Sequence, residues 1–215
     1  LHSFPTRRSS DLFGNVERPT HVNTSWDLAK FEVCAQKWVD LSEGDLGVAL
    51  LNNGKYGYDI RGNVMRMSLL RAPKAPDPMC DMGKHRFTYV LLPHFGPYQY
   101  AQVVPSAYAL NAPPRIAELD PSRGEAGSLP IFVDCDDRNL VIEAVKKAED
   151  SGDLIVRLYE AHNSRGRAFL SCARRIERAV LCDLEENELM DLDVTSDGVL
   201  VEYKPFEILT IKLQV

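Results

Sequence analysis

The chain has 215 residues, of which 45% are hydrophobic, 8% aromatic and 26% charged, so its composition excludes a disordered, collagen-like or coiled-coil protein and allows one or two globular domains. Lys and Arg total 25 against 31 Asp and Glu, and the formal charge of −6 argues against a nucleic-acid partner, because binding to a phosphate backbone needs a basic surplus. No apolar run approaches the roughly 20 residues that span a bilayer, so no membrane partner is expected.

The first twelve residues lack the apolar core of a targeting peptide. The string from His2 to Leu12 instead matches one reading frame of a common short-read sequencing adaptor. We therefore predict that residues 1–12 are a non-native, adaptor-derived segment that makes no packed contacts with the rest of the chain, and that sequence upstream of Phe13 is missing. A natural basic arm is the alternative interpretation.

From residue 31 to residue 70 the hydrophobic pattern has the period of strands. The expected strands are residues 31–35, 47–51, 56–60 and 64–70. A turn at residues 42–45 separates the first two. Asn52-Asn53-Gly54 and Arg61-Gly62-Asn63 are further turn signals, because successive residues there can take positive φ. The last three runs therefore predict an antiparallel meander.

Prolines at positions 73, 76 and 78 predict a loop, since each removes a ladder donor. A strand is expected from His85 to Leu92, ending before Pro93. The apolar residues of 98–110 have helical spacing, although Pro105 favours a short or broken helix. Residues 111–128 are rich in Pro, Gly and Ser, which is typical of a linker.

The second half contains short β-prone runs separated by turns such as Ser151-Gly152-Asp153. The expected strands are residues 140–145, 154–159, 168–172, 180–184, 199–203 and 206–213. Strands at this spacing predict a sandwich of about immunoglobulin size. The predicted fold class is therefore mainly β, with antiparallel β-sandwich domains in tandem over residues 13–110 and 129–215.

Three acidic motifs admit a functional and a structural interpretation. Asp81 stands four residues before His85, which could supply two metal ligands, but a turn that opens a strand is favoured. Residues 134–137 offer hard oxygens for calcium but lack the Gly and the distal Glu of a calcium loop, so a solvated turn is favoured. Residues 185–188 are interpreted as a solvated loop.

Recognisable catalytic motifs are missing from the sequence. It contains no Gly-rich phosphate loop, no GxSxG elbow and no HExxH motif, and its Ser, His and Asp residues have no spacing typical of a triad. Its five cysteines are widely spread without a CxxC pair, which favours a reducing, cytoplasmic environment over a disulfide framework or a zinc knuckle. The residues alone therefore indicate a tandem β-sandwich with no catalytic residue or metal ligand to nominate.

Longer motifs stand in a fixed order through both halves of the chain. In the first half they are residues 13–21, 23–27, 31–33, 37–43, 47–52, 55–59, 68–71 and 76–78, with Asp81, Gly83, His85 and Pro93-His94. In the second half they are residues 141–150, 156–161 and 204–213. Together these motifs resemble the C-terminal part of glycoside hydrolase family 38 α-mannosidases, most closely the cytosolic type, and the resemblance covers residues 13–215.

The resemblance implies that the parent is a retaining exo-α-mannosidase that hydrolyses terminal α-mannose of oligosaccharides. Such an enzyme combines an α/β barrel and a three-helix bundle with C-terminal β-domains, of which residues 13–110 would be the end of the large one. In the family the catalytic carboxylates and the ligands of a zinc ion lie upstream of the residues matched here. The resemblance therefore implies that the zinc binds in the missing N-terminal catalytic domain and that this chain alone is inactive. Homo-oligomerisation stays open.

We expect Lys55, Tyr56 and Arg71 to lie nearest the mouth of the parent's active site. Lys55 and Tyr56 follow a turn at the start of a strand. Tyr offers a flat face to a sugar ring, while Lys and Arg donate to hydroxyl oxygens. The alternative is that Tyr56 is core and that the two cations are solvated or paired with Asp59 or Asp77.

A second hypothesis, from a different class, is a free-standing carbohydrate-binding or scaffolding β-sandwich module with no hydrolase upstream. The genomic sequence upstream of residue 13 distinguishes the two hypotheses. A continuous frame that encodes the barrel supports the enzyme, whereas a native start codon supports the module.

Overall fold

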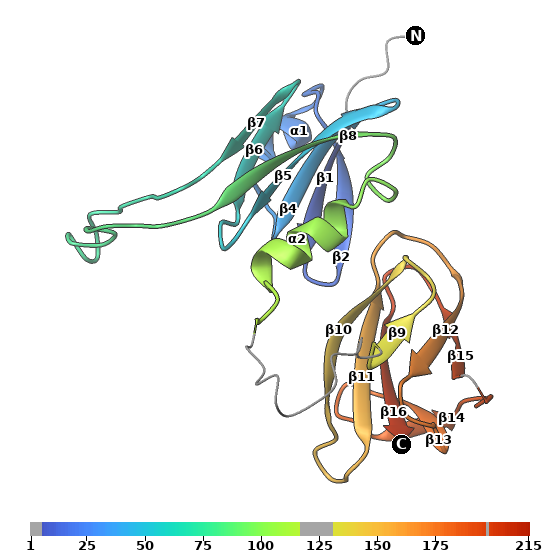
Figure 1. Ribbon diagram of the computed structural model, residues 1–215. Helices are drawn as coiled ribbons and strands as arrows, with labels where there is room; N and C mark the ends of the chain where they lie inside the picture. The colour runs from blue at the N-terminus through green and yellow to red at the C-terminus, as the bar shows by residue number, and fades with distance from the viewer. Residues whose placement is uncertain (1–5, 117–130, 197) are drawn as a thin grey trace. The chain divides into compact units, whose positions relative to one another are not determined.

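The computed structural model of the protein describes residues 6–116, 131–196 and 198–215. The chain divides into two compact units, residues 1–115 and 116–215, which consist mainly of antiparallel strands (Figure 1). The mainly β fold class expected from the sequence is thus confirmed. The division falls inside the predicted linker 111–128, most of which lies outside the described residues.

Unit 1 contains a larger sheet, a smaller sheet and two helices. The larger sheet consists of β1 (Thr6–Asp11), β2 (Gly14–Pro19), β4 (Trp38–Glu43), β5 (Leu46–Asn52) and β8 (Tyr89–Phe95). The smaller sheet consists of β3 (Val33–Cys34), β6 (Gly57–Arg61) and β7 (Val64–Met67), and the helices are α1 (Ser25–Ala29) and α2 (Val103–Asn111). The strand orders are β2-β1-β4-β5-β8 and β3-β6-β7.

Strands β4 and β5 are buried on both faces over much of their length, so neither alternates: β5 is a nearly continuous apolar run, whereas β4 includes the buried Asp40. Toward the smaller sheet, Val39 and Leu50 belong to one core cluster with Tyr58 and Ile60. Trp38 points the other way because successive side chains of a strand alternate. The indole ring of Trp38 stacks on the ring of Tyr98, with centroids 5.2 Å apart. Tyr98 lies in the turn that leads into α2.

The predicted meander is wrong, because β5 and β6 do not pair with each other. β5 pairs with β4 and β8, whereas β6 pairs with β3 and β7, so residues 52–56 carry the chain from one sheet to the other. Asn52 is buried in this corner, where its side chain accepts from Lys55 N at 2.6 Å and donates to the Tyr58 hydroxyl. Burial raises the pKa of Tyr58. The Asn-Asn-Gly signal therefore marks a corner between sheets rather than a hairpin.

Two prolines stand inside elements of unit 1. Strand β8 continues through Pro93, beyond the end predicted for it, because β8 is an edge strand and alternate N–H groups of an edge have no ladder partner. Pro105 is the third residue of α2, where N–H groups lack intrahelical partners in any case. The helix is therefore unbroken, and it begins five residues later than the predicted range 98–110.

Residues 6–11 form a strand between β2 and β4. All six pair with β2, and Thr6 to Ser9 also pair with β4, with Arg8 opposite Asp40. The prediction that residues 1–12 make no packed contacts is therefore wrong for this stretch. Strand pairing uses backbone N–H and C=O groups, so a segment can occupy such a place without selected side chains. Phe4 lies outside the described residues, and the adaptor origin stays a prediction.

Unit 2 is a sandwich of a five-stranded and a three-stranded sheet. The larger sheet contains β10 (Leu140–Lys147), β11 (Leu154–Glu160), β13 (Arg178–Cys182), β14 (Glu188–Asp191) and β16 (Ile208–Gln214). The smaller sheet contains β9 (Val133–Cys135), β12 (Gly166–Cys172) and β15 (Val199–Tyr203). The strand orders are β10-β11-β16-β13-β14 and β15-β12-β9. The structure contains all six strands predicted here, and β9 and β14 are additional.

The core of unit 2 lies between its two sheets. The alternation is clearest in β15, where Val199, Val201 and Tyr203 are buried and the residues between them are exposed. These three belong to one cluster with residues of the opposite sheet, among them Leu158 and Ile211. This one-sided burial explains why the period of two was visible in the sequence.

A buried carboxylate joins two turns at one end of this sandwich. Glu160 is fully buried at the end of β11. Its Oε1 accepts from His162 N at 2.7 Å and from the Ser164 hydroxyl at 2.9 Å, and its Oε2 accepts from the backbone N of Asn163 and of Phe206, both at 2.9 Å. Asn163 and Phe206 have positive φ angles of 61° and 56°. The carboxylate thus supports two turns whose backbone is strained.

Glu160→Gln is expected to lower the free energy of unfolding of unit 2 by about 2–3 kcal/mol, because an amide nitrogen would face donors and leave them unsatisfied. The matched control is Glu202→Gln at a 69% exposed ion pair with Arg167, with an expected loss below about 1 kcal/mol. Urea unfolding followed by circular dichroism measures both variants. Tryptophan fluorescence identifies the separate transition of unit 1, because Trp26 and Trp38 both lie there. Equal losses in the two variants would contradict the assignment.

Candidate functional site

Residues 68–88, here called the arm, connect β7 to β8 and run away from the two sheets of unit 1 as two extended branches (Figure 1). At the base of the arm, Ser68 N donates to Gly57 O at 2.9 Å. On the returning branch, Thr88 N donates to Asn53 Oδ1 at 2.8 Å, and Asn53 N donates to Thr88 O at 3.3 Å. The arm is therefore attached to the corner 52–56.

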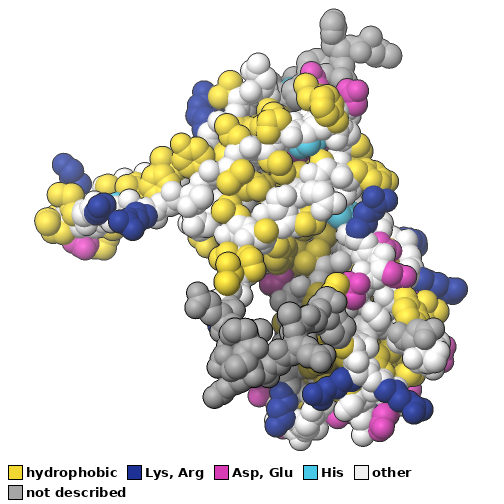
Figure 2. Space-filling view, in the orientation of Figure 1, with side chains coloured by type: hydrophobic (Ala, Val, Ile, Leu, Met, Phe, Trp, Pro, Cys, Tyr) yellow, Lys and Arg dark blue, Asp and Glu magenta, His cyan; other side chains and the backbone are white. Residues whose placement is uncertain are grey.

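The surface of the arm is largely apolar. Met79 and Met82 are 64% and 67% exposed, and Leu69 and Leu70 are also exposed. Figure 2 shows apolar side chains along the arm, with basic side chains near its tip. Isolated exposed apolar residues are common on proteins, but a contiguous exposed stretch of them is typical of an interaction surface.

Two of the three sequence-predicted site residues lie at the base of the arm. Lys55 Nζ lies over the ring of Phe87, 5.1 Å from its centroid, which is within cation–π range. Tyr56 is 55% exposed, and its carbonyl accepts from Ala35 N at 3.0 Å. The alternative in which Tyr56 is core is therefore wrong, and Tyr58 is the buried tyrosine of this strand.

Arg71 lies on the outgoing branch of the arm and is exposed. Asp59, which was considered as an ion-pair partner for it or for Lys55, pairs instead with Arg61 at 3.3 Å and Arg66 at 2.8 Å. The structure thus brings Lys55 and Tyr56 together at the corner and places Arg71 on the adjoining arm. Contact of these residues with a substrate stays a prediction.

Sequence reasoning did not find a buried polar pair in the larger sheet of unit 1. His94 on β8 and Asp40 on β4 are both buried, and His94 Nε2 lies 2.8 Å from Asp40 Oδ1. His94 Nδ1 lies 3.1 Å from Gly96 O. Each of the two ring nitrogens therefore faces an oxygen atom. The two residues are 54 positions apart, and only the strand register brings them together.

This pair depends on a glycine. Strand β5 lies between β4 and β8, and Gly47 of β5 stands opposite both Ser42 and His94. A Cβ at Gly47 would lie 2.4 Å from His94 Cε1, so the imidazole can cross β5 only because this side chain is absent. Isolated Gly inside a strand often marks such a close approach.

The chemistry of the pair favours a structural role. The Ser42 hydroxyl donates to Asp40 Oδ2 at 2.6 Å. The carboxylate therefore stands between the hydroxyl and the imidazole, whereas a nucleophilic triad needs the imidazole next to the hydroxyl. The arrangement joins strands β4 and β8 and does not activate Ser42.

The other acidic motifs are engaged in local structure. Asp81 Oδ2 accepts from Ala72 N at 2.9 Å, and His85 Nε2 lies 2.8 Å from the Asp81 carbonyl rather than its carboxylate. Asp136 Oδ1 accepts from Phe169 N at 2.7 Å. Within residues 6–116, 131–196 and 198–215, no three His, Cys, Asp or Glu side chains gather as metal ligands would.

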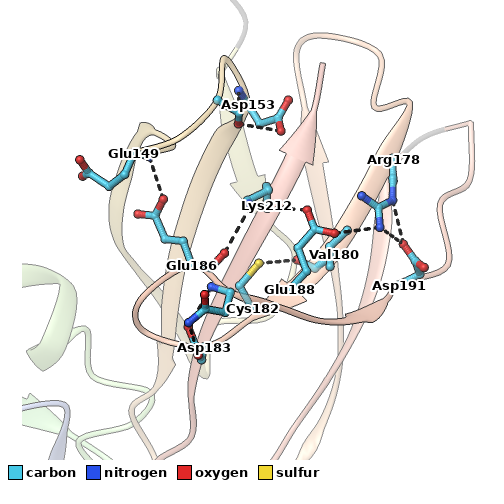
Figure 3. Close-up of polar contacts among 12 residues, drawn as sticks. Glu149, Asp153, Arg178, Val180, Cys182, Asp183, Glu186, Glu188, Asp191 and Lys212 are labelled. Carbon is cyan, nitrogen blue, oxygen red and sulfur yellow. Dashed lines mark hydrogen bonds and ion pairs between the residues drawn. The ribbon is translucent and has the colours of Figure 1, made fainter.

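A network of charged side chains covers the outer face of the larger sheet of unit 2 (Figure 3). Arg178 donates to Glu188 at 3.0 Å and to Asp191 at 2.9 Å, and these bonds raise its pKa. The same contact with Arg178 lowers the pKa of Glu188, and a bond from Lys146 lowers the pKa of Glu186. All these side chains lie near the surface. The network therefore favours solubility and adds modest stability, and it does not form a binding pocket.

Two family models match the chain. The model described as "Glycosyl hydrolases family 38 C-terminal domain" matches residues 6–79. The model described as "Glycosyl hydrolases family 38 C-terminal beta sandwich domain" matches residues 139–211. The chain therefore belongs to glycosyl hydrolase family 38 and carries C-terminal β-domains of that family. The first match begins inside the adaptor-like segment.

Among known proteins, the chain is similar to Alpha-mannosidase 2C1 of Homo sapiens, with 44% identity over 221 residues that cover 98% of this chain and 21% of that protein. Alpha-mannosidase 2C1 of Mus musculus is 44% identical over 94% of this chain and 20% of that protein. An alpha-mannosidase of Saccharomyces cerevisiae is 35% identical over 94% of this chain and 20% of its own length. The chain thus spans about a fifth of the length of these relatives.

Solved structures show the same fold. An alpha-mannosidase from Enterococcus faecalis V583 superposes with a TM-score of 0.77 and 21% identity, over 97% of this chain and 24% of that one. A family 38 glycosyl hydrolase from Enterococcus faecalis gives a TM-score of 0.75 with 20% identity, over 97% of this chain and 25% of that one.

In the part of the chain that the structure describes, helices long and apolar enough to cross a membrane are absent.

Gly47→Ala is expected to lower the free energy of unfolding of unit 1 by about 1–3 kcal/mol, because the new methyl group overlaps the His94 ring and forces it away from Asp40. The matched control is Gly152→Ala, where a Cβ meets nothing within 4 Å and the change is expected to stay within about 0.5 kcal/mol. Urea unfolding followed by circular dichroism measures both variants, and tryptophan fluorescence, which follows the buried Trp38, assigns the change in Gly47→Ala to unit 1. An unchanged fluorescence midpoint in Gly47→Ala would refute the dependence on Gly47.

Proposed function

We propose that this chain is the C-terminal part of a retaining exo-α-mannosidase that hydrolyses terminal α-mannose of mannose-containing oligosaccharides. The observation that carries the proposal is the 44% identity to Alpha-mannosidase 2C1 over 98% of the chain, together with matches in both units to C-terminal domains of family 38. The free cysteines among the described residues, of which Cys34 is exposed, support a cytoplasmic location for the parent.

The catalytic chemistry of the parent is expected outside this chain. A retaining glycosidase needs two carboxylates about 5–5.5 Å apart, one that attacks the anomeric carbon and one that serves as acid and then as base. The carboxylates that are buried among the described residues, Asp40 and Glu160, belong to different units and are occupied by internal donors. The described residues do not fit a zinc ion either, so zinc in the parent would bind elsewhere.

The role proposed for unit 1 is to support and extend the active site from outside. The arm would pack its apolar side chains against the catalytic domain, since burial of Met79, Met82 and their neighbours on another surface removes them from water. Tyr56 would then offer its exposed ring to a sugar near the mouth of the site, with Lys55 and Arg71 as donors to hydroxyl oxygens.

A chimera tests the proposal. Residues 13–215 replace the matching C-terminal fifth of human Alpha-mannosidase 2C1, and hydrolysis of an aryl α-mannoside is measured with and without zinc. We expect the chimera to be active, the human protein lacking this fifth to be inactive, and the 215-residue chain alone to be inactive with or without zinc. A soluble, folded chimera without activity would contradict the assignment, and turnover by the chain alone would contradict its dependence on a catalytic domain.

Tyr56→Ala in the active chimera is expected to lower kcat/KM for an oligosaccharide by about tenfold, or about 1.4 kcal/mol of transition-state binding, through loss of the ring face. Tyr100→Ala is the matched control, because Tyr100 is 61% exposed and lies in the turns before α2, outside the arm and the corner 52–56. Steady-state kinetics measures both. Unchanged kcat/KM in a folded Tyr56→Ala chimera would remove Tyr56 from the substrate path.

A further inference from the structure

A polar segment occupies an inner position of the larger sheet of unit 1. Strand β1 lies between β2 and β4 (Figure 1). It consists of polar residues, and Thr6 is its one residue of a type that is enriched in strands. Inner strands are normally rich in β-branched and aromatic residues, because these pack against neighbours on the pleated surface. The sequence of β1 therefore does not explain its place in the sheet.

The turn that joins β1 to β2 does not explain this place either. Leu12 and Phe13 form the two-residue turn, and both are exposed. Leu12 has a φ angle of 29°, in the left-handed range that favours glycine, whereas two-residue hairpin turns are normally built from Gly, Asn or Asp. A leucine in this conformation costs free energy. The local chemistry of the chain thus opposes the hairpin rather than directs it.

The two neighbouring strands supply the bonds that hold β1. All six of its residues pair antiparallel with β2, and Thr6 to Ser9 pair antiparallel with β4 as well. A residue with a strand on each side can bond its N–H and C=O groups to one neighbour or the other, whatever its side chain. We call the space between β2 and β4 the strand slot. It holds β1 by backbone groups.

Both walls of the strand slot are held by contacts that do not involve β1. All six residues of β4 pair with β5 on the side away from the slot. Directly after β2, the buried Thr20 accepts through its carbonyl from Gly62 N at 3.2 Å, in the turn between β6 and β7. The chain then continues from β2 through the capped helix α1. The slot is therefore built by the rest of unit 1, and β1 fills it.

We propose that the strand slot is a binding site for an extended peptide segment, which it takes up by strand addition between β2 and β4. Its ligand is a segment of about six residues without proline, recognised by its backbone and not by its side chains. Addition to the edge of a sheet gives one ladder of hydrogen bonds, whereas a segment in this slot gains a ladder on each side. Residues 6–11 are its occupant in this chain, and the site is independent of the mannosidase assignment.

Exchange of the occupant tests the proposal on the full chain. A protease cleavage sequence inserted between Leu12 and Phe13 frees residues 1–12 from their covalent link, and fluorescence anisotropy follows the uptake of a labelled peptide of residues 1–12. We expect saturable binding of one peptide per chain in exchange for the unlabelled segment. Absence of saturable uptake would overturn the proposal. Departure of residues 1–12 on cleavage with an unchanged urea midpoint of tryptophan fluorescence would do the same.

Three further peptides separate recognition of the backbone from recognition of side chains. Arg8 lies opposite Glu17 of β2 and Asp40 of β4, so Arg8→Pro removes a ladder donor and is expected to weaken binding about tenfold or more. The matched control Arg8→Ala keeps this donor. That peptide, and one with residues 6–11 in shuffled order, are expected to bind within about threefold of the original peptide. Loss of binding by the shuffled peptide, or equal binding of Arg8→Pro and Arg8→Ala, would contradict the proposal.

The uncut chain gives a second measurement that decides even if the cleaved chain does not fold. In the uncut chain we expect Arg8→Pro to lower the urea midpoint of tryptophan fluorescence, which reports on unit 1. Arg8→Ala and the shuffled order of residues 6–11 are expected to leave this midpoint unchanged. A shuffled chain as unstable as Arg8→Pro would show that the slot selects side chains, and the proposal would fail.

Discussion

The larger sheet of unit 1 depends on the absence of one side chain, that of Gly47. His94 of the edge strand reaches Asp40 of a central strand only by passing over this glycine. The pair is buried, so removal of one partner would leave the other without compensation in a medium of low dielectric constant. The contact joins the far end of β8 to the centre of the sheet, while the near end, where the returning branch of the arm enters β8, is held by the hydrogen bonds between Thr88 and Asn53. Lys55 lies over the ring of Phe87 beside these bonds.

The sequence predicted the terminal sandwich better than the first unit, for a physical reason. Strands such as β15 bury one face and expose the other, so their alternation is visible without a structure. In β4, Trp38, Val39 and Asp40 are all buried, because the strand is covered on both sides and includes a buried charge. No period of two is present there, and this strand was missed. The passage of the chain from one sheet to the other at Asn52 was not predicted either, because a turn signal does not show with which strand the following strand pairs.

The residues of the candidate site likewise divide into those that the sequence predicted and those that it did not. The turn signal correctly indicated that Lys55 and Tyr56 occupy an exposed corner, since local chemistry determines a turn. The pairing of Asp40 with His94 depends on the register between strands that are distant in the sequence. A short window of sequence does not encode that register. Membership of the family came from long ordered motifs, and those motifs specify relatives rather than the positions of side chains.

Pro93 has a consequence for the behaviour of the chain in concentrated solution. Strand β8 is a seven-residue edge strand with solvent-exposed apolar side chains, among them Leu91, which is 63% exposed, and Phe95, which is 84% exposed. Such an edge is a template on which a strand of another molecule can grow, and successive additions lead to aggregation. A proline in the middle of the edge removes a donor and interrupts the continuous ladder that an incoming strand would need. Pro93, which from the sequence alone was predicted to end the strand, thus disfavours the edge-to-edge pairing that leads to fibrils.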